Sequence, residues 1–241
     1  MQIVSCVDYA DMSRKTARII AAQVQLKPFS VLGLATGSTP IGTYKEVIRF
    51  HKDEEVDFSH VTTVNLDEYY GLAPTHEQSY RFFMQHNLFD HINISPEKTH
   101  VPDGLTKDVA KTCAEYDNLV TSLGGTDIQL LGIGDNGHIA FNEPNAFFFA
   151  STHLVDLTEE TINANARFFE SEAEVPRQAI TMGLRSILSA RLILLLASGS
   201  NKAAAIAGMI NGPIDPQLPA SILQLHQNVM VIADKKALAL I

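Results

Sequence analysis

The chain has 241 residues, 46% of them hydrophobic, which is enough for one large domain with its own core. Its 27 acidic and 18 basic residues give a formal net charge of −9 without a basic cluster, which disfavours a nucleic-acid partner. The two cysteines, Cys6 and Cys113, lie far apart and outside any Cys/His cluster, which argues against a disulfide scaffold or a zinc site. No uncharged apolar run approaches membrane-spanning length, and the N-terminus carries Asp8 and Asp11 where a signal peptide would be apolar. We therefore expect a single domain over residues 1–241, in the cytoplasm and without a membrane partner.

The first half of the chain alternates between short apolar runs and amphipathic segments. Residues 2–6 predict a strand, and Asp8 is placed to cap the helix that follows, in which apolar residues recur at helical spacing. A buried strand over residues 30–35 leads into a second helix, for which Thr39 is the expected N-cap and Pro40 the first helical residue. Further elements are predicted as a strand over 61–66, a helix over 79–89 and an amphipathic helix over 109–123.

The second half repeats this alternation. Residues 128–133 form an apolar run that ends in glycines, and residues 154–157 predict a short strand before a helix capped by Thr158. Residues 179–188 fit either a helix throughout or a strand that enters a shorter helix. The remaining elements are a core strand over 192–197, an alanine-rich helix after Lys202 and a last strand over 229–233.

This order of elements predicts the fold class. Strands that alternate with helices, several of them continuous apolar runs, indicate a parallel sheet covered on both faces. We expect an α/β protein with a three-layer α/β/α, Rossmann-like arrangement. In such sheets ligands bind outside the carboxyl ends of the strands, where the strand order reverses. Four predicted strands, ending near residues 35, 66, 133 and 197, run directly into loops rich in glycine or carboxylate groups, and we expect these loops to share one pocket.

The loop Thr36-Gly37-Ser38-Thr39 has the features of a phosphate site. Glycine lets the backbone approach an anion, the hydroxyl groups are donors, and the free N–H groups at a helix start point at the ligand. The segment matches neither the Walker loop nor the dinucleotide-binding glycine motif. The alternative is an ordinary capped turn between a strand and a helix.

Two basic residues are candidates to neutralise a bound anion. Lys202 follows a Ser-Gly-Ser segment at the start of a helix, where a point charge suits a phosphate group. Arg167 precedes two phenylalanines, and its guanidinium could bind phosphate through two hydrogen bonds. Each residue could equally be a solvated surface cation.

Three further residues are candidates for proton transfer. Asp67 follows an apolar strand, where a poorly hydrated carboxylate has a raised pKa and becomes a competent base; it could equally cap a turn. His138 and Glu143 are five residues apart, which is not the spacing of a metal-binding helix, and we expect no metal. A carboxylate beside an imidazole raises its proton affinity, so the two form a candidate proton-transfer pair, although a histidine in a loop can also be purely structural.

Five motifs together resemble the glucosamine-6-phosphate deaminases, also called glucosamine-6-phosphate isomerases. The resemblance covers nearly the whole chain, with the motifs in the family's order. They are Leu-Ala-Thr-Gly-Ser-Thr-Pro (34–40), Asn-Leu-Asp-Glu-Tyr (65–69), Gly-Ile-Gly-Asp-Asn-Gly-His-Ile-Ala-Phe-Asn-Glu-Pro (132–144), Asn-Ala-Arg-Phe-Phe (165–169) and Gly-Ser-Asn-Lys-Ala (199–203). The related 6-phosphogluconolactonases share the fold and the phosphate loop but typically lack the second motif in combination with the end of the third.

The resemblance implies conversion of glucosamine 6-phosphate and water to fructose 6-phosphate and ammonia, without a cofactor. It implies that Asp67 moves a proton from C2 toward C1 through an enolamine, and that His138 is the acid/base that opens the sugar ring. It also implies that Glu143 and Asn136 orient and tune the histidine; some members carry aspartate at the Asn136 position, so hydrogen bonding is its expected role. The phosphate contacts implied are Gly37, Ser38, Thr39, Arg167 and Lys202, with Thr36 in the same loop.

The sequence departs from the family in two places. Residues 145–151 include three consecutive phenylalanines where relatives carry a more polar segment with an arginine, and we expect these rings to pack under a lid or against a subunit. The chain also stops soon after Ala233, whereas longer members use a C-terminal extension to bind an N-acetylglucosamine 6-phosphate activator. We therefore expect no such activation. Residues 154–182, which contain Arg167, are expected to form a mobile lid.

Other functions remain open at this point. A lactonase acting on a sugar-acid phosphate would release no ammonia. A non-catalytic sugar-phosphate sensor would normally carry a DNA-binding helix-turn-helix, for which the predicted strand at residue 2 leaves no room at the N-terminus. The small-molecule partner is a sugar phosphate in each case. The protein could be a monomer or a homo-oligomer, and it could prefer the glucosamine or the galactosamine sugar.

Overall fold

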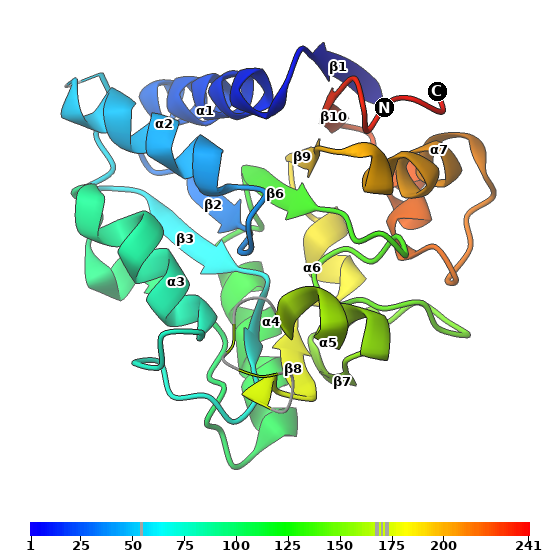
Figure 1. Ribbon diagram of the computed structural model, residues 1–241. Coiled ribbons are helices and arrows are strands. Elements are labelled where there is room, and N and C mark those ends of the chain that lie inside the picture. The colour runs from blue at the N-terminus through cyan, green and yellow to red at the C-terminus, as the bar shows by residue number, and fades with distance from the viewer. Residues whose placement is uncertain (54, 167–168, 170, 172–173) are drawn as a thin grey trace.

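The computed structural model describes residues 1–241 apart from 54, 167–168, 170 and 172–173, and its main sheet is parallel (Figure 1). Within the described residues this sheet has seven strands in the order β1-β10-β9-β6-β2-β3-β5, and every neighbouring pair is parallel. Its strands are β1 (Gln2–Cys6), β2 (Val31–Leu34), β3 (Thr62–Asn65), β5 (Thr99–His100), β6 (Ile128–Gly132), β9 (Leu192–Ala197) and β10 (Val229–Asp234). The predicted α/β class and parallel sheet are confirmed.

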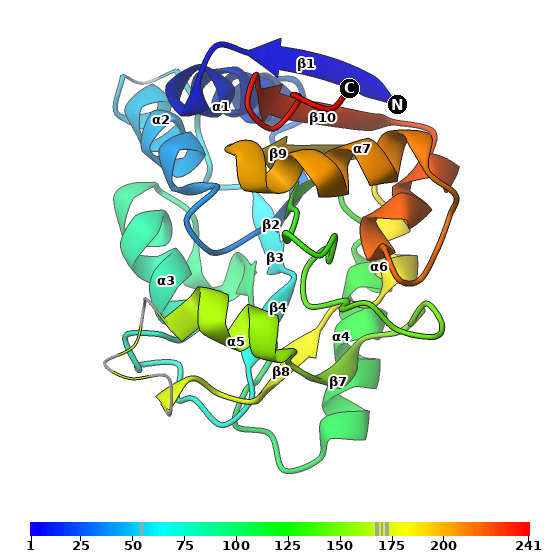
Figure 2. The same cartoon turned by 45° about the vertical axis from the view of Figure 1, so that its right-hand side comes forward.

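Helices flank the sheet, with α1 and α2 packed side by side along one part of it (Figures 1 and 2). Asp8 caps α1 as predicted, because its side chain accepts a hydrogen bond from the N–H of Asp11. The predicted cap of α2 is wrong by one residue: Pro40 is the N-cap, without a side-chain hydrogen bond, and the helix begins at Ile41. The α-helices here are α1 (Tyr9–Leu26), α2 (Ile41–Lys52), α3 (Tyr80–Asn87), α4 (Val109–Ser122), α6 (Leu184–Leu188) and α7 (Ala203–Asn211); the 3₁₀ helices are η1 (Phe89–His91), η2 (Pro96–Lys98), η4 (Ser200–Lys202) and η5 (Pro219–Leu225).

A second, antiparallel sheet lies with helix α5 (Glu159–Ala166) at one end of the molecule (Figure 2). Its strands are β4 (Asp67–Tyr69), β8 (Gln178–Thr181) and β7 (His153–Asp156), in that order. For the ambiguous residues 179–188, the alternative of a strand entering a short helix is the one observed, as β8 followed by α6. Strand β4, which follows β3 after a single residue, was not predicted.

The centre of the main sheet explains the continuous apolar runs. Leu130 and Leu131 of β6 and Leu194 and Leu195 of β9 have no exposed surface, because helices cover both faces of these neighbouring strands. The strand order reverses between β2 and β6: β3 and β5 lie beyond β2, and β9 and β10 lie beyond β6. Loops that leave β2 and β6 therefore diverge, and the crevice between them is the expected ligand position.

Among the described residues, no helix is long and apolar enough to cross a membrane. The three consecutive phenylalanines are mostly accommodated within the chain. Phe148 packs against the main core, Phe149 stacks on His153 with ring centroids 4.2 Å apart, and Phe147 remains exposed.

Candidate active site

A cavity of about 640 Å³ opens at the carboxyl ends of the central strands. Its walls come from the loops after β2, β3, β6 and β9, which are the four loops that the sequence predicted to meet, together with α5. Of the ten predicted site residues, eight line the cavity, and Glu143 lies directly behind one of them. The eight are Thr36, Gly37, Ser38, Thr39, Asp67, Asn136, His138 and Lys202. Arg167 lies outside the described residues.

One end of the cavity is built to receive an anion. Gly37 has a φ of +83°, a conformation that L side chains rarely adopt, and this turn presents residues 36–39 to the cavity. Lys202 enters from η4 on the far side, beside Asn201. Lys202 is the only lysine or arginine among the described residues that line the cavity. Its ammonium donates to the Asp135 carboxylate, to which Asn201 Nδ2 also donates at 3.0 Å.

Asp67 supplies a buried acid on another wall. It is the first residue of β4 and pairs with Thr181 of β8, so backbone hydrogen bonding fixes its position. Its carboxyl accepts no hydrogen bond from the part of the chain that the structure describes. Burial, and secondarily the neighbouring Glu68 carboxylate, raise the pKa of Asp67 to about 8.

The adjacent Glu68 points the other way. Its carboxylate accepts the N–H groups of Tyr80 and Arg81, at 2.8 and 2.9 Å, at the start of α3. A carboxylate at that position satisfies helix N–H groups and interacts favourably with the helix dipole. Two consecutive carboxyl groups therefore have different environments: Glu68 stabilises a helix start, and Asp67 faces the cavity with few polar neighbours.

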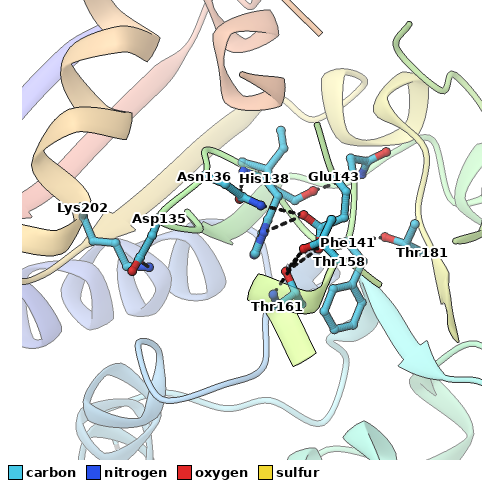
Figure 3. A network of polar contacts seen from close by, with 11 residues as sticks. Asp135, Asn136, His138, Phe141, Glu143, Thr158, Thr161, Thr181 and Lys202 are labelled. Carbon is cyan, nitrogen blue, oxygen red and sulfur yellow. Dashed lines mark hydrogen bonds and ion pairs between the residues drawn. The ribbon is translucent and has the colours of Figure 1, made fainter. Parts of the chain in front are cut away.

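His138 and Glu143 form a pair in the loop after β6 (Figure 3). The imidazole Nδ1 lies 3.2 Å from Glu143 Oε2, which also accepts Asn136 Nδ2 at 2.9 Å. Although burial alone would raise the pKa of Glu143, contacts with His138, Thr161 and Asn136 hold it below its usual value. Glu143 thus stays ionised, orients Nδ1 and leaves Nε2 for a ligand in the cavity.

The shape of this loop depends on its glycines. A Cβ at Gly134 would lie 2.4 Å from His138 Cε1, so the imidazole ring rests directly against the glycine backbone. Gly137 has a φ of +84°, and a Cβ there would also collide with Leu218. Ala140, two residues after the histidine, has a φ of +52°, which is uncommon for a residue with a side chain.

Helix α5 contacts Glu143 directly, and this was not predicted. The hydroxyl of Thr161 donates to Glu143 Oε1, and the Thr158 hydroxyl lies 3.4 Å from the same oxygen (Figure 3). Thr158 also caps the helix as predicted, since its hydroxyl accepts the Thr161 N–H.

Asp135 and Asn201 are the other functional candidates that sequence reasoning missed. Both residues lie within the motifs, but the hydrogen bonds between Asp135 and the residues of η4 join segments that are distant in sequence.

None of the described residues forms a group of three or more histidine, cysteine, aspartate or glutamate side chains that could hold a metal ion.

The chain matches a family of known proteins over most of its length. Residues 9–232 match the model of the family described as glucosamine-6-phosphate isomerases/6-phosphogluconolactonase, so the chain belongs to this family of α/β enzymes. Individual relatives that it matches are named glucosamine-6-phosphate deaminase. The chain is 58% identical to the glucosamine-6-phosphate deaminase of Lachnoclostridium phytofermentans, over 96% of this chain and 98% of that one. It is 54% identical to the glucosamine-6-phosphate deaminase of Halothermothrix orenii over 100% of both chains.

A solved structure described as a monomeric glucosamine-6-phosphate deaminase has the same fold throughout. It superimposes with a TM-score of 0.98 at 48% identity, and the match covers 100% of both chains. The resemblance stated from the five motifs is therefore confirmed over the full length of the chain.

Proposed function

We propose that the protein converts glucosamine 6-phosphate and water to fructose 6-phosphate and ammonia. The observation that carries this proposal is the arrangement of one cavity with an anion site at one end, a buried acid of raised pKa on one wall and a histidine–glutamate pair on another. Full-length similarity to proteins named glucosamine-6-phosphate deaminase supports the same reaction.

The phosphate group is the anchor of the proposed substrate. Backbone N–H and hydroxyl groups of residues 36–39 and the ammonium of Lys202 receive it, and we assign Arg167 the same role from its motif. Because the phosphate is remote from C2, its binding energy can fix the position of the reacting carbons.

His138 opens the sugar ring in this proposal. The pyranose loses its O1 proton and gains one on O5, which yields the open-chain aldehyde, and Nε2 carries out this transfer. Glu143 stabilises the imidazolium that forms when the ring takes a proton, because it stays ionised and lies 3.2 Å from Nδ1. Asn136 helps to hold this pair: its side chain donates to Glu143 and accepts the His138 N–H at 3.1 Å.

Asp67 then takes the C2 proton, which the adjacent aldehyde has made acidic. The C2–H electrons form the C1–C2 double bond of an enolamine, while the carbonyl electron pair moves to O1, which takes a proton from the ammonium group on C2. The proton held by Asp67 is then returned to C1, and the nitrogen lone pair forms the C2–N double bond. This leaves an imine at C2, to which water adds and from which ammonia departs. An acid with a pKa near neutrality suits both removal and return of the proton, because neither direction is strongly uphill.

The decisive assay measures ammonia and ketose phosphate together, with glucosamine 6-phosphate and with its galacto epimer. The Asp67→Asn variant should lose at least about a hundredfold in ammonia release, since a positioned base typically contributes a hundred- to ten-thousandfold. Binding of inorganic phosphate should be retained, because residues 36–39 and Lys202 supply the donors proposed for the anion and Asp67 is not among them. Full activity in this variant would remove Asp67 from its role, and hydrolysis of 6-phosphogluconolactone without ammonia release from the amino sugar would favour a lactonase.

We further propose that the protein acts as a monomeric single domain in the cytoplasm. A relative of 48% identity is described as monomeric, and the cavity is formed within one chain. Cys6 and Cys113 are both buried and unpaired, which suits a reducing compartment. The lid expected over residues 154–182 remains a proposal. β7 and β8 pair with each other, and β8 also pairs with β4, so among the described residues we assign this motion to helix α5 between them.

A further inference from the structure

The anion end of the cavity already contains an anion that belongs to the protein. Asp135, in the loop after β6, accepts a hydrogen bond from Lys202 (Figure 3). It also accepts from Asn201, the other donor that η4 presents to the cavity. Interaction with these donors holds the pKa of the Asp135 carboxyl below its usual value although partial burial opposes this, so the group is ionised at neutral pH. The Lys202 ammonium and the Asp135 carboxylate therefore form an ion pair with no net charge.

The exposure of the two partners indicates which one yields to a ligand. The Lys202 side chain is 19% exposed, whereas the Asp135 side chain is 47% exposed. The ammonium is thus held in the wall, and the carboxylate lies on its solvent side. A phosphate that approaches the ammonium therefore meets the Asp135 carboxylate, which competes for the same positive charge and repels the incoming anion.

The loop does not depend on this ion pair for its shape. The Gly134 N–H donates to the carbonyl of His138, and the Gly137 N–H donates to the carbonyl of Gly134, at 2.9 and 3.0 Å. Asn136 accepts the His138 N–H within the same turn. Asp135 can therefore move or lose its charge while His138 stays in place.

We propose that Asp135 is a specificity-determining counter-anion that binds Lys202 and Asn201 in the free protein and competes with the phosphate of the substrate for these donors. The proposal rests on the function proposed above and refines its anion site. This competition weakens binding of every anion, but a dianion competes for the ammonium better than a monoanion does. The site consequently selects dianionic phosphate esters over sugars that carry a single carboxylate, and it releases free phosphate readily.

The first test compares binding of inorganic phosphate to the wild type and to the Asp135→Asn variant by titration calorimetry. Asparagine keeps the size of the side chain and can still contact Asn201, but its neutral amide oxygen competes for the ammonium much less than a carboxylate does. Affinity for phosphate should rise about two- to fivefold, the range expected for removing a half-exposed ion pair. The KM for glucosamine 6-phosphate should fall by a similar factor. Glu115→Gln is the matched control, because it removes one negative charge from the exposed face of α4 and should change neither quantity.

The second test uses pH. Its ligand is glycerol 3-phosphate, because a phosphate monoester loses its dianionic form as the pH falls through about 6. In the wild type the resulting monoanion competes poorly with Asp135, so affinity should drop steeply between pH 7.5 and 5.5. The drop should be shallower in the Asp135→Asn variant. A purely structural aspartate would leave the two pH profiles parallel.

The third test asks whether the effect passes through Lys202. In a Lys202→Met background, the gain from Asp135→Asn should shrink to the part caused by direct repulsion between carboxylate and phosphate. Unchanged or weaker phosphate binding in Asp135→Asn alone, parallel pH profiles, or a full gain without Lys202 would each overturn the proposal. Failure of the wild type to release ammonia would overturn the deaminase function instead, while the phosphate titrations would still decide the role of Asp135.

Discussion

At the scale of single residues, the pKa values of two carboxyl groups in the site are shifted in opposite directions by their environments. Burial and Glu68 raise the pKa of Asp67, whereas His138, Thr161 and Asn136 offset burial and lower that of Glu143. Such a divergence assigns different tasks to groups of the same chemistry: the raised acid exchanges protons, and the lowered one remains a fixed charge. The sequence indicated both residues as candidates, but their separation into two roles depends on burial and on partners that only the fold supplies.

The raised pKa of Asp67 has a consequence for stability that can be measured without substrate. Below its ordinary pKa of 3.8 the group is protonated in both the folded and the unfolded state. Between that value and about 8 only the folded state keeps the proton, so the stability contributed by Asp67 falls as the pH rises through this window and is lost above about 8. Asparagine does not titrate, so the melting temperature of Asp67→Asn should exceed that of the wild type by an amount that grows from pH 5 to 8.5.

The expected difference at the upper end is a few kcal/mol, or roughly 5–10 °C for a chain of this size. Differential scanning calorimetry of both proteins at matched pH values measures it, and the difference between them removes the contribution of all other titrating groups. A melting-temperature difference that is constant over this range would mean that Asp67 ionises at its ordinary pKa in the folded protein.

At the scale of elements, the strands of the main sheet were predictable because each is a continuous apolar run bounded by a turn signal. β9 has the bounds that the sequence predicted, and β6 differs by one residue. Both strands are buried on both faces, so the ends of each apolar run define the ends of the strand. β4 was not predictable in the same way. It has three residues and exists because Asp67 pairs with Thr181, a contact between segments distant in sequence that no local pattern encodes.

Helix α5 is joined to the histidine–glutamate pair by two hydroxyl groups. Thr161 and Thr158 both contact Glu143 Oε1, while Oε2 contacts His138, so a single carboxylate connects α5 to the group proposed to open the sugar ring. We expect the Thr161→Val variant, which keeps the shape and removes the hydroxyl, to loosen α5 and to disturb the orientation of His138. A hydrogen bond to a charged group contributes about 1.5–3 kcal/mol, so kcat/KM should fall roughly tenfold or more.

Hydrogen exchange separates this account from a simple loss of stability. Amides of residues 159–166 should exchange faster in Thr161→Val, while those of β6 and β9 should not change. Thr161→Ser is the matched control, because it retains the hydroxyl and should keep near wild-type activity and exchange. Normal kcat/KM in Thr161→Val would show that the contact has no part in the reaction.

At the scale of the whole molecule, the reversal of strand order between β2 and β6 places the site. It brings the loops after β2, β3, β6 and β9 to one edge, where their polar residues surround a single cavity. This convergence could be predicted, since the carboxyl ends of parallel strands lie on the same edge. The pairings inside the cavity could not, because Asp135 and Lys202 are 67 residues apart and meet only through the order of β6 and β9 in the sheet.

We also expect the protein to bind and convert its substrate as a monomer, without cooperativity between subunits. The cavity is formed within one chain, and of the three consecutive phenylalanines only Phe147 is exposed, which leaves a small apolar surface there for a partner. Cooperative binding requires coupling between sites, which identical subunits in a symmetric oligomer usually supply. We expect light scattering after size exclusion to give a mass near 26.4 kDa and the rate to rise hyperbolically with glucosamine 6-phosphate. Addition of N-acetylglucosamine 6-phosphate should leave the curve hyperbolic, whereas a sigmoidal curve that this compound makes hyperbolic would establish an activator site and linked subunits.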